Sequence, residues 1–244
     1  MPDRPPAMQG EVYAAEPRAP ALSFSLGEAL DRGVAGMRRD GVVLTVAQVL
    51  ASVPGGLVAV AFRLALGQPH FGSRAWLERS LVLMACGAVV SSLFRGGLLR
   101  MALATARGAR PRLADLARGA RFFPAMLAFE VVHLVVVALS IPLLFVPYVL
   151  VWTAGALAQL RLVDRDEGFV DAVRWSFDAT RGERLHLFGF LVATAVIGYL
   201  GVLACCVGAF PAAALTSVAT AHVYLRLSGV SGVSGDGDAA SAEA

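Results

Sequence analysis

The sequence predicts an all-α membrane protein: a polytopic bundle of six transmembrane helices, arranged as three hairpins, each preceded by a cytoplasmic amphipathic helix. Three observations lead to this fold class. The 244 residues are 57% hydrophobic and only 16% charged, whereas soluble domains are about 45–50% apolar and about 25% charged. The apolar residues form long runs, and arginines cluster between the runs. Lipid is therefore the expected solvent of the apolar segments.

The clearest run lies between Arg121 and Arg161, where Glu130 is the only residue with a formal charge. A membrane-spanning helix needs about 20 apolar residues. The run holds about two such lengths, and Ser140-Ile141-Pro142 between them is expected to form a tight turn. The pattern predicts a transmembrane helical hairpin.

The two ends of the chain differ in composition from this middle part. Residues 1–22 are rich in Pro and Ala, and residues 228–244 consist mainly of Ser, Gly, Asp and Ala. Both compositions are typical of disordered tails, which leaves residues 23–227 as one membrane domain. The N-terminus lacks a charged start followed by an apolar core, so we expect no cleavable signal peptide.

The first hairpin unit begins after the N-terminal tail. Ser25 and Glu28 have the spacing of a capping box, which predicts an amphipathic helix that ends at Asp40-Gly41. The 22 uncharged residues between Asp40 and Arg63 form the first expected span. Pro54-Gly55-Gly56 in its middle predicts a kink, which neighbouring helices must compensate.

The second span is too short if it stops at a charge. Only 15 uncharged residues separate Arg79 from Arg95, so the span is expected to continue through Arg95 and Arg100. An arginine at the membrane centre costs about 2.5–3.5 kcal/mol, and extension of its side chain toward the nearer surface reduces this cost.

Residues 107–121 are expected to form the second amphipathic helix, which Pro111 can start. Its apolar face would consist of Leu113, Leu116, Ala117 and Ala120. Such a basic helix at the inner leaflet attracts anionic lipids, by about 1 kcal/mol per arginine, or alternatively braces the bundle at the interface. The candidate headgroup-binding residues are Arg107, Arg110, Arg112, Arg118 and Arg121.

The last unit follows the opening hairpin. Residues 164–184 carry ten charges, and Phe169, Ala172, Val173 and Phe177 share the apolar face of a third amphipathic helix. The 41 residues between Arg184 and Arg226 have no formal charge and are divided near Pro211. The six expected spans are about 42–64, 80–103, 122–140, 143–163, 185–207 and 211–227.

The arginines also predict the orientation. They cluster before the first span and in residues 107–121 and 161–184, whereas only Arg74 and Arg79 lie on the opposite side. The positive-inside rule places both termini and the two charged loops in the cytoplasm. The predicted location is therefore the cytoplasmic membrane, with the lipid bilayer as the main partner and no role for nucleic acid.

The three surface helices share a short pattern, which suggests an internal repeat. An acid follows an apolar residue by two positions at Leu26-x-Glu28, Leu113-x-Asp115 and Phe169-x-Asp171. Repeats are common in membrane proteins that transport solutes, but they are also a simple way to build any bundle. A pattern this short is also compatible with coincidence.

One of these helices carries a resemblance to a known family. The segment Asp171-Ala172-Val173-Arg174-Trp175-Ser176, followed by Gly182 at the start of a span, resembles a broad group of six-span bacterial and archaeal integral membrane proteins of unassigned activity. That group is similar to the membrane domain fused to some glycerophosphodiester phosphodiesterases. Pro142 and Pro147-Tyr148 fit the same layout. The resemblance implies a fold and a membrane location, and it implies no activity.

Glu130 and His133 are the strongest candidates for a functional site. They are spaced i and i+3 in the third span, so they share a helix face, and Glu130 lies near the expected mid-membrane depth. An ionisable residue at this depth is by default a functional hypothesis. The alternatives are a structural pair, a proton or ion path, and a metal site. Arg95 lies at a similar depth, so we predict that it pairs with Glu130.

The remaining residues contain no recognisable catalytic constellation. Cys86, Cys205 and Cys206 are expected to be packing residues, and we expect no metal, cofactor or enzymatic activity. The first functional hypothesis is therefore a non-enzymatic scaffold, assembly or lipid-interacting protein. The alternative is a small transporter or permease-like protein with an intramembrane site formed by Glu130, His133 and Arg95. A membrane-embedded enzyme has the least support.

Overall fold

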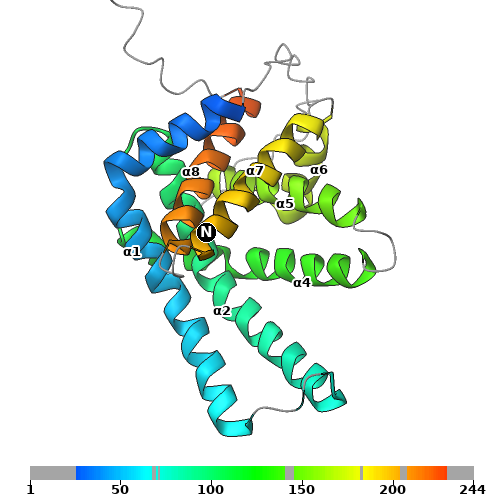
Figure 1. Ribbon diagram of the computed structural model, residues 1–244. Coiled ribbons are helices and arrows are strands. Elements are labelled where there is room, and N and C mark those ends of the chain that lie inside the picture. Colours follow the sequence, from blue (N-terminus) through cyan, green and yellow to red (C-terminus); the bar gives the residue numbers. More distant parts are fainter. Residues whose placement is uncertain are drawn as a thin grey trace, which may run out of the picture.

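The computed structural model describes residues 26–67, 70, 72–140, 146–181, 184–203 and 208–229. Within these ranges the chain is helical and forms no strand, which confirms the all-α prediction (Figure 1). Ser25, Pro142, Gly182, both adjacent cysteines and nearly all of the two tails lie outside the described residues. The helices are α1 (Leu26–Leu66), α2 (Arg74–Ala106), α3 (Ala114–Arg118), the 3-10 helix η1 (Gly119–Phe122), α4 (Phe123–Ser140), α5 (Val146–Arg165), α6 (Phe169–Ala179), α7 (Arg184–Leu203) and α8 (Ala209–Leu227).

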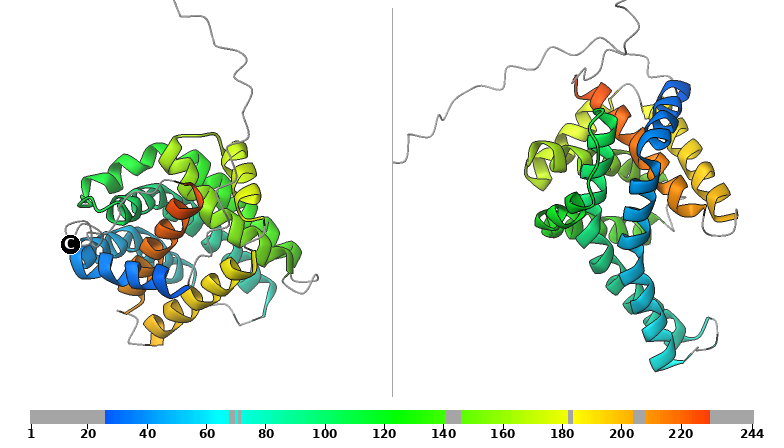
Figure 2. Two further views of the ribbon diagram at one scale, coloured as in Figure 1. Left: turned by 90° about the horizontal axis from the view of Figure 1, so that it is seen from above. Right: turned by 90° about the vertical axis from the view of Figure 1, so that its left-hand side faces the viewer.

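Consecutive long helices pack in pairs: α1 with α2, α4 with α5, and α7 with α8. Figures 1 and 2 show that the three pairs diverge from a common junction, and that the α1–α2 pair extends furthest from it. Helix α8 is central to the junction because it contacts α1, α2, α5 and α7. The largest fully buried side chains, among them Tyr224, Met101, Met126 and Leu160, lie there.

Helix α1 corrects one prediction. It does not end at Asp40-Gly41. The helix is 41 residues long in total and continues without a break through Pro54. Asp40 is only 9% exposed and forms a salt bridge of 2.8 Å with Arg39. The Arg39 guanidinium also donates to the backbone oxygen of Thr105 on α2, at 3.1 Å. The charge of Asp40, which the sequence analysis took as a helix end, is thus compensated by its neighbour Arg39. Figure 1 shows that α1 changes direction mainly in its blue N-terminal part.

Helix α2 runs without interruption through Arg95 and Arg100, as predicted. Its start is defined by Ser73, whose hydroxyl accepts a hydrogen bond from the backbone N–H of Trp76, at 3.1 Å. The guanidinium of Arg79 donates to the carbonyl oxygens of Leu66 and Gly67 at the end of α1. These contacts satisfy carbonyls that the end of α1 leaves without helical partners, and they join the far ends of the two helices.

The segment that follows α2 differs from the predicted amphipathic helix. Residues 107–121 do not form one helix; they contain the five-residue α3 and then η1. Of the predicted apolar face only Leu116 is buried, whereas Leu113 is 45% exposed and Ala117 and Ala120 are exposed. The buried positions are instead Leu116, Gly119 and Phe122, because a 3-10 geometry places every third residue on one face.

This face packs against a pair of glycines in α2. A methyl group at Gly96 would lie 2.7 Å from the backbone oxygen of Gly119, and one at Gly97 would lie 2.5 Å from the Cα atom of Leu116. A methyl group at Gly119 would overlap the backbone nitrogen of Gly97. The two backbones therefore touch, and only glycine fits at their crossing. The crossing fixes where η1 ends and where α4 begins.

Apolar side chains cover the outside of the diverging helices. In the described residues four helical segments are long and apolar enough to cross a membrane: Leu26–Leu66, Arg74–Ala106, Ala114–Val136 and His186–Leu203. A soluble protein rarely exposes large continuous apolar surfaces, so the chain has the properties of a membrane protein. The exposed apolar residues include Leu50, Leu57, Val60, Leu64, Leu77, Leu81, Val131, Val135, Val192, Val196 and Leu200.

The glycine crossing gives a first prediction. Gly119→Ala should destabilise the protein by at least about 1–3 kcal/mol, because the added methyl group meets backbone atoms that cannot move aside. The measurement is the thermal unfolding temperature of the purified protein in detergent. Gly87→Ala in α2 is the control, since a methyl group there meets nothing within 4 Å and should leave stability unchanged or raise it. Equal unfolding temperatures for the two variants would contradict the crossing.

Candidate functional site

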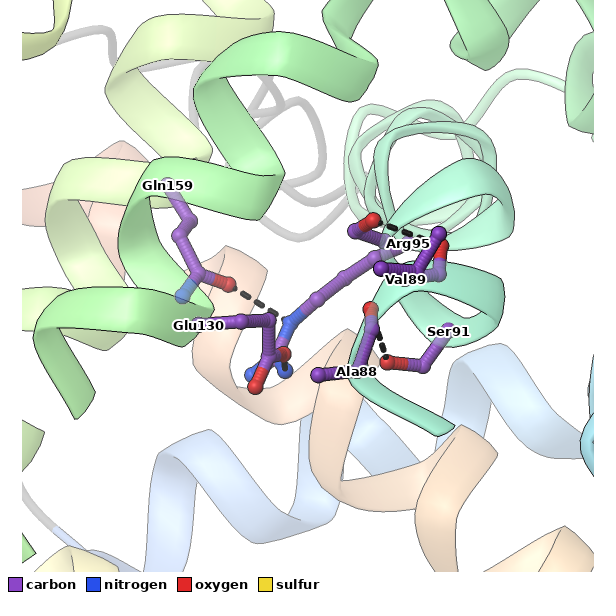
Figure 3. Close-up of polar contacts among 7 residues, drawn as sticks. Ala88, Val89, Ser91, Arg95, Glu130 and Gln159 are labelled. Atoms are coloured by element: carbon purple, nitrogen blue, oxygen red, sulfur yellow. Dashed lines mark hydrogen bonds and ion pairs between the residues drawn. The ribbon is translucent and has the colours of Figure 1, made fainter. Parts of the chain in front are cut away.

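Two charged residues of the predicted spans, Arg95 and Glu130, meet where α2, α4 and α5 come together. Arg95 of α2 forms an ion pair with Glu130 of α4, which confirms the predicted pairing (Figure 3). The Nε atom of Arg95 also donates a hydrogen bond of 2.8 Å to the side-chain oxygen of Gln159 on α5. Glu130 is 16% exposed and Arg95 is 42% exposed, and Gln159 is buried. One guanidinium therefore links three helices.

The local sequence explains why these side chains converge. Arg95 directly precedes Gly96 and Gly97, so the backbone crossing that begins α4 lies next to it. Glu130 then follows Met126 and Phe129 on α4, both of which are buried against the core. Because residues four apart share a helix face, Glu130 is directed to the same side as Met126, where α2 passes.

The sequence analysis predicted a role in the site for His133 but did not predict one for Gln159. Gln159 is the only amide in the apolar run 143–163, and that isolation was the available signal. His133 lies one turn beyond Glu130 on α4 and is partly buried. The arrangement leaves the carboxylate of Glu130 facing a cation, and this ion pair lowers the cost of placing either charge in an apolar surrounding.

The five arginines proposed to bind lipid divide into two sets. Arg107 forms an ion pair with Asp164, Arg118 lies 3.2 Å from Asp115, and Arg121 lies 3.6 Å from Asp166. Their charges are therefore compensated by carboxylates of the same chain. Arg110 and Arg112 are exposed, and neither guanidinium forms an ion pair within the part of the chain that the structure describes.

A second polar group, which the sequence analysis missed, holds the junction together. The hydroxyl of fully buried Tyr224 donates to Asp164 at 2.9 Å, and the same carboxylate pairs with Arg107. Arg161 lies 2.9 Å from Glu167 and stacks over the ring of Trp175, 4.8 Å from its centroid. Trp175 and Tyr224 are themselves in edge contact, with 5.5 Å between ring centroids.

A third polar group joins the first and last helices. Glu28 of α1 lies 2.9 Å from Arg32 and also pairs with Arg226 of α8. These side chains and His222 line a shallow pocket between the two helices. The sequence separation of Glu28 and Arg226 spans nearly the whole membrane domain, so sequence patterns alone could not indicate this contact.

The described residues contain no cluster of three or more His, Cys, Asp or Glu side chains that could hold a metal ion. In each of the three polar groups, charged side chains from different parts of the chain form ion pairs and so neutralise one another. No family model, curated protein or solved structure matches the chain. The interpretation of the site therefore depends on its own geometry.

The Arg95–Glu130 pair predicts a strong energetic coupling. Arg95→Gln and Glu130→Gln should each lower stability by about 2–4 kcal/mol, because each leaves an uncompensated charge. The double variant should lose less than the sum, since two amides can bond to each other and no charge remains. Thermal unfolding of the four proteins gives the coupling energy, which we expect to exceed about 1 kcal/mol.

Arg74 and Glu78 provide the matched control for this cycle. They form an ion pair of 2.8 Å with side chains 93% and 62% exposed, and the coupling of such a pair should stay below about 1 kcal/mol. If the Arg95–Glu130 coupling is no larger than that of the Arg74–Glu78 pair, the structural role assigned to Arg95 and Glu130 is wrong.

Proposed function

We propose that the protein is a multi-pass integral membrane protein with a non-enzymatic scaffold, assembly or lipid-interacting role. Its six helices α1, α2, α4, α5, α7 and α8 would cross the cytoplasmic membrane as three hairpins, with both termini in the cytoplasm. In this proposal the polar junction faces the cytoplasm and the far ends of the helix pairs face the other side. The resemblance to six-span bacterial and archaeal membrane proteins is consistent with this arrangement.

The scaffold role is supported mainly by the ion pair that neutralises the charges of Arg95 and Glu130 in the proposed spans. Glu130 and Arg95 form an ion pair, and the side-chain oxygen of Gln159 accepts a hydrogen bond from the Nε atom of Arg95. A transport site needs groups that can exchange a partner for a solute or a proton during each cycle. A carboxylate held by a guanidinium on a neighbouring helix is better suited to fixing the position of the helices.

A small transporter with a site formed by Glu130, His133 and Arg95 is the alternative. It is favoured by the 42% exposure of the Arg95 side chain, which leaves one side of the pair accessible. His133 lies one turn from Glu130 on the same helix and is partly buried. The two proposals differ in whether the protein moves protons across a membrane.

The topology can be tested by labelling single cysteines in intact cells, after the three native cysteines are replaced. We expect an impermeant maleimide to label Ser73→Cys and Ala209→Cys from outside, because both lie at the far ends of helix pairs. Gly168→Cys and Ser228→Cys should react only after the membrane is permeabilised. Labelling of all four positions in intact cells, or of none, would contradict the six-span arrangement.

The transport alternative is tested in proteoliposomes that carry a pH gradient and an internal pH-sensitive dye. The scaffold proposal predicts that the wild-type protein dissipates the gradient no faster than protein-free liposomes. Glu130→Gln should behave in the same way, and the exposed Glu78→Gln variant serves as the control. A wild-type flux that persists in Glu78→Gln and disappears in Glu130→Gln would replace the scaffold proposal with the transporter.

A further inference from the structure

We infer that Arg110, Arg112 and Leu113 form a binding site for the headgroup of an anionic phospholipid. The inference rests on the proposed membrane location and narrows its lipid-interacting role to one loop. It also separates two arginines from the other three candidates of residues 107–121. Sequence patterns give no reason to distinguish these five arginines. The structure distinguishes them, because three of them form ion pairs with carboxylates of the chain.

The loop that carries these residues is held in a defined conformation. At its start the backbone N–H of Ala109 donates to the carbonyl oxygen of Ala104, at 2.9 Å, and Arg39 of α1 donates to the carbonyl oxygen of Ala109, at 3.3 Å. At its end the backbone N–H of Arg112 donates to the carboxylate of Asp115, at 3.1 Å. The loop is therefore fastened on both sides of the two arginines.

Arg110 and Arg112 stand on either side of a buried proline. Pro111 is buried, whereas Arg110 before it and Arg112 after it are exposed. Leu113 is the next residue and is 45% exposed. The loop thus presents two uncompensated cations beside an exposed apolar side chain.

This combination matches the chemistry of a phospholipid at the bilayer surface. A guanidinium donates paired hydrogen bonds to phosphate oxygens in a geometry that suits its planar fork. An apolar side chain next to the cations can enter the boundary between headgroups and acyl chains. A free phosphate or an acidic peptide would use the arginines but would leave the exposed Leu113 without a role.

The charge pattern of the neighbouring residues supports the same location. The guanidinium groups of Arg107, Arg118 and Arg121 each lie within 4 Å of a carboxylate. An anionic headgroup approaching one of them also meets that negative charge. The guanidinium groups of Arg110 and Arg112 form no ion pair within the described residues, and the nearby Asp115 carboxylate pairs with Arg118 and accepts from the backbone N–H of Arg112. Arg110 and Arg112 are therefore the arginines of residues 107–121 whose guanidinium charges are available to an anion.

The test compares two double variants with the same change in net charge. The purified full-length protein in detergent is mixed with phosphatidylglycerol or phosphatidylcholine, and native mass spectrometry measures the lipid bound at each concentration. Arg110→Gln/Arg112→Gln should weaken phosphatidylglycerol binding by about 30-fold. Arg118→Gln/Arg121→Gln should weaken it by less than about 3-fold. Phosphatidylcholine binding should be the same in all proteins.

Two further variants test the loop without removing its charge. Arg110→Lys/Arg112→Lys keeps both cations and should retain most of the affinity. Leu113→Asn keeps both arginines and should lower the affinity several-fold, because the apolar contact is lost. Inorganic phosphate at the same concentration as the lipid should not displace phosphatidylglycerol.

Three results would overturn the inference. Equal losses in the two double variants would mean that net charge alone attracts the lipid. Unchanged affinity in Arg110→Gln/Arg112→Gln would exclude the loop, and displacement by inorganic phosphate would identify a phosphate site in its place. The cysteine-labelling experiment reports on the membrane topology independently, so failure of the lipid site and failure of the proposed membrane arrangement are distinguishable.

Discussion

The contact between the backbones of α2 and η1 is the constraint on which the rest of the structure depends. Gly96 and Gly97 on one side and Gly119 on the other allow the two segments to touch without intervening side chains. That contact sets the start of α4, and α4 then carries Glu130 to Arg95. Small residues are the usual means by which membrane helices approach closely, and here they also position a charge pair.

Polar contacts connect helices within a junction whose buried side chains are mainly apolar, and apolar side chains also cover the outside of the helices. Ion pairs and the buried tyrosine hydroxyl connect helices at the junction, whereas leucine and valine side chains cover the outer surfaces of the diverging helices. In hydrocarbon, association of helices gains nothing from burying leucine, so packing and polar contacts must supply the specificity. The three polar groups each join helices that are distant in sequence, and this explains how the junction is held together.

Several features were predictable because they depend on composition or on distance along a helix. The all-helical fold followed from the apolar runs, and the continuation of α2 through Arg95 followed from a span that was otherwise too short. The Arg95–Glu130 pair followed from matched depth and opposite charge. The predictions that failed concerned local ends and faces. Asp40-Gly41 looked like a helix end, but Arg39 compensates Asp40 and the helix continues.

By itself the sequence predicted an all-helical chain with several helices apolar enough for lipid, and it indicated that Arg95 and Glu130 needed a partner. These properties are local, because they depend on runs of side chains and on the 1.5 Å rise of a helix. Only the tertiary structure decided the partners and faces: Gln159 for Arg95, Tyr224 for Asp164, and a buried Leu116 near an exposed Leu113. The physical reason is that partners are set by where segments distant in the sequence approach each other in space, and a local run of side chains does not encode that approach.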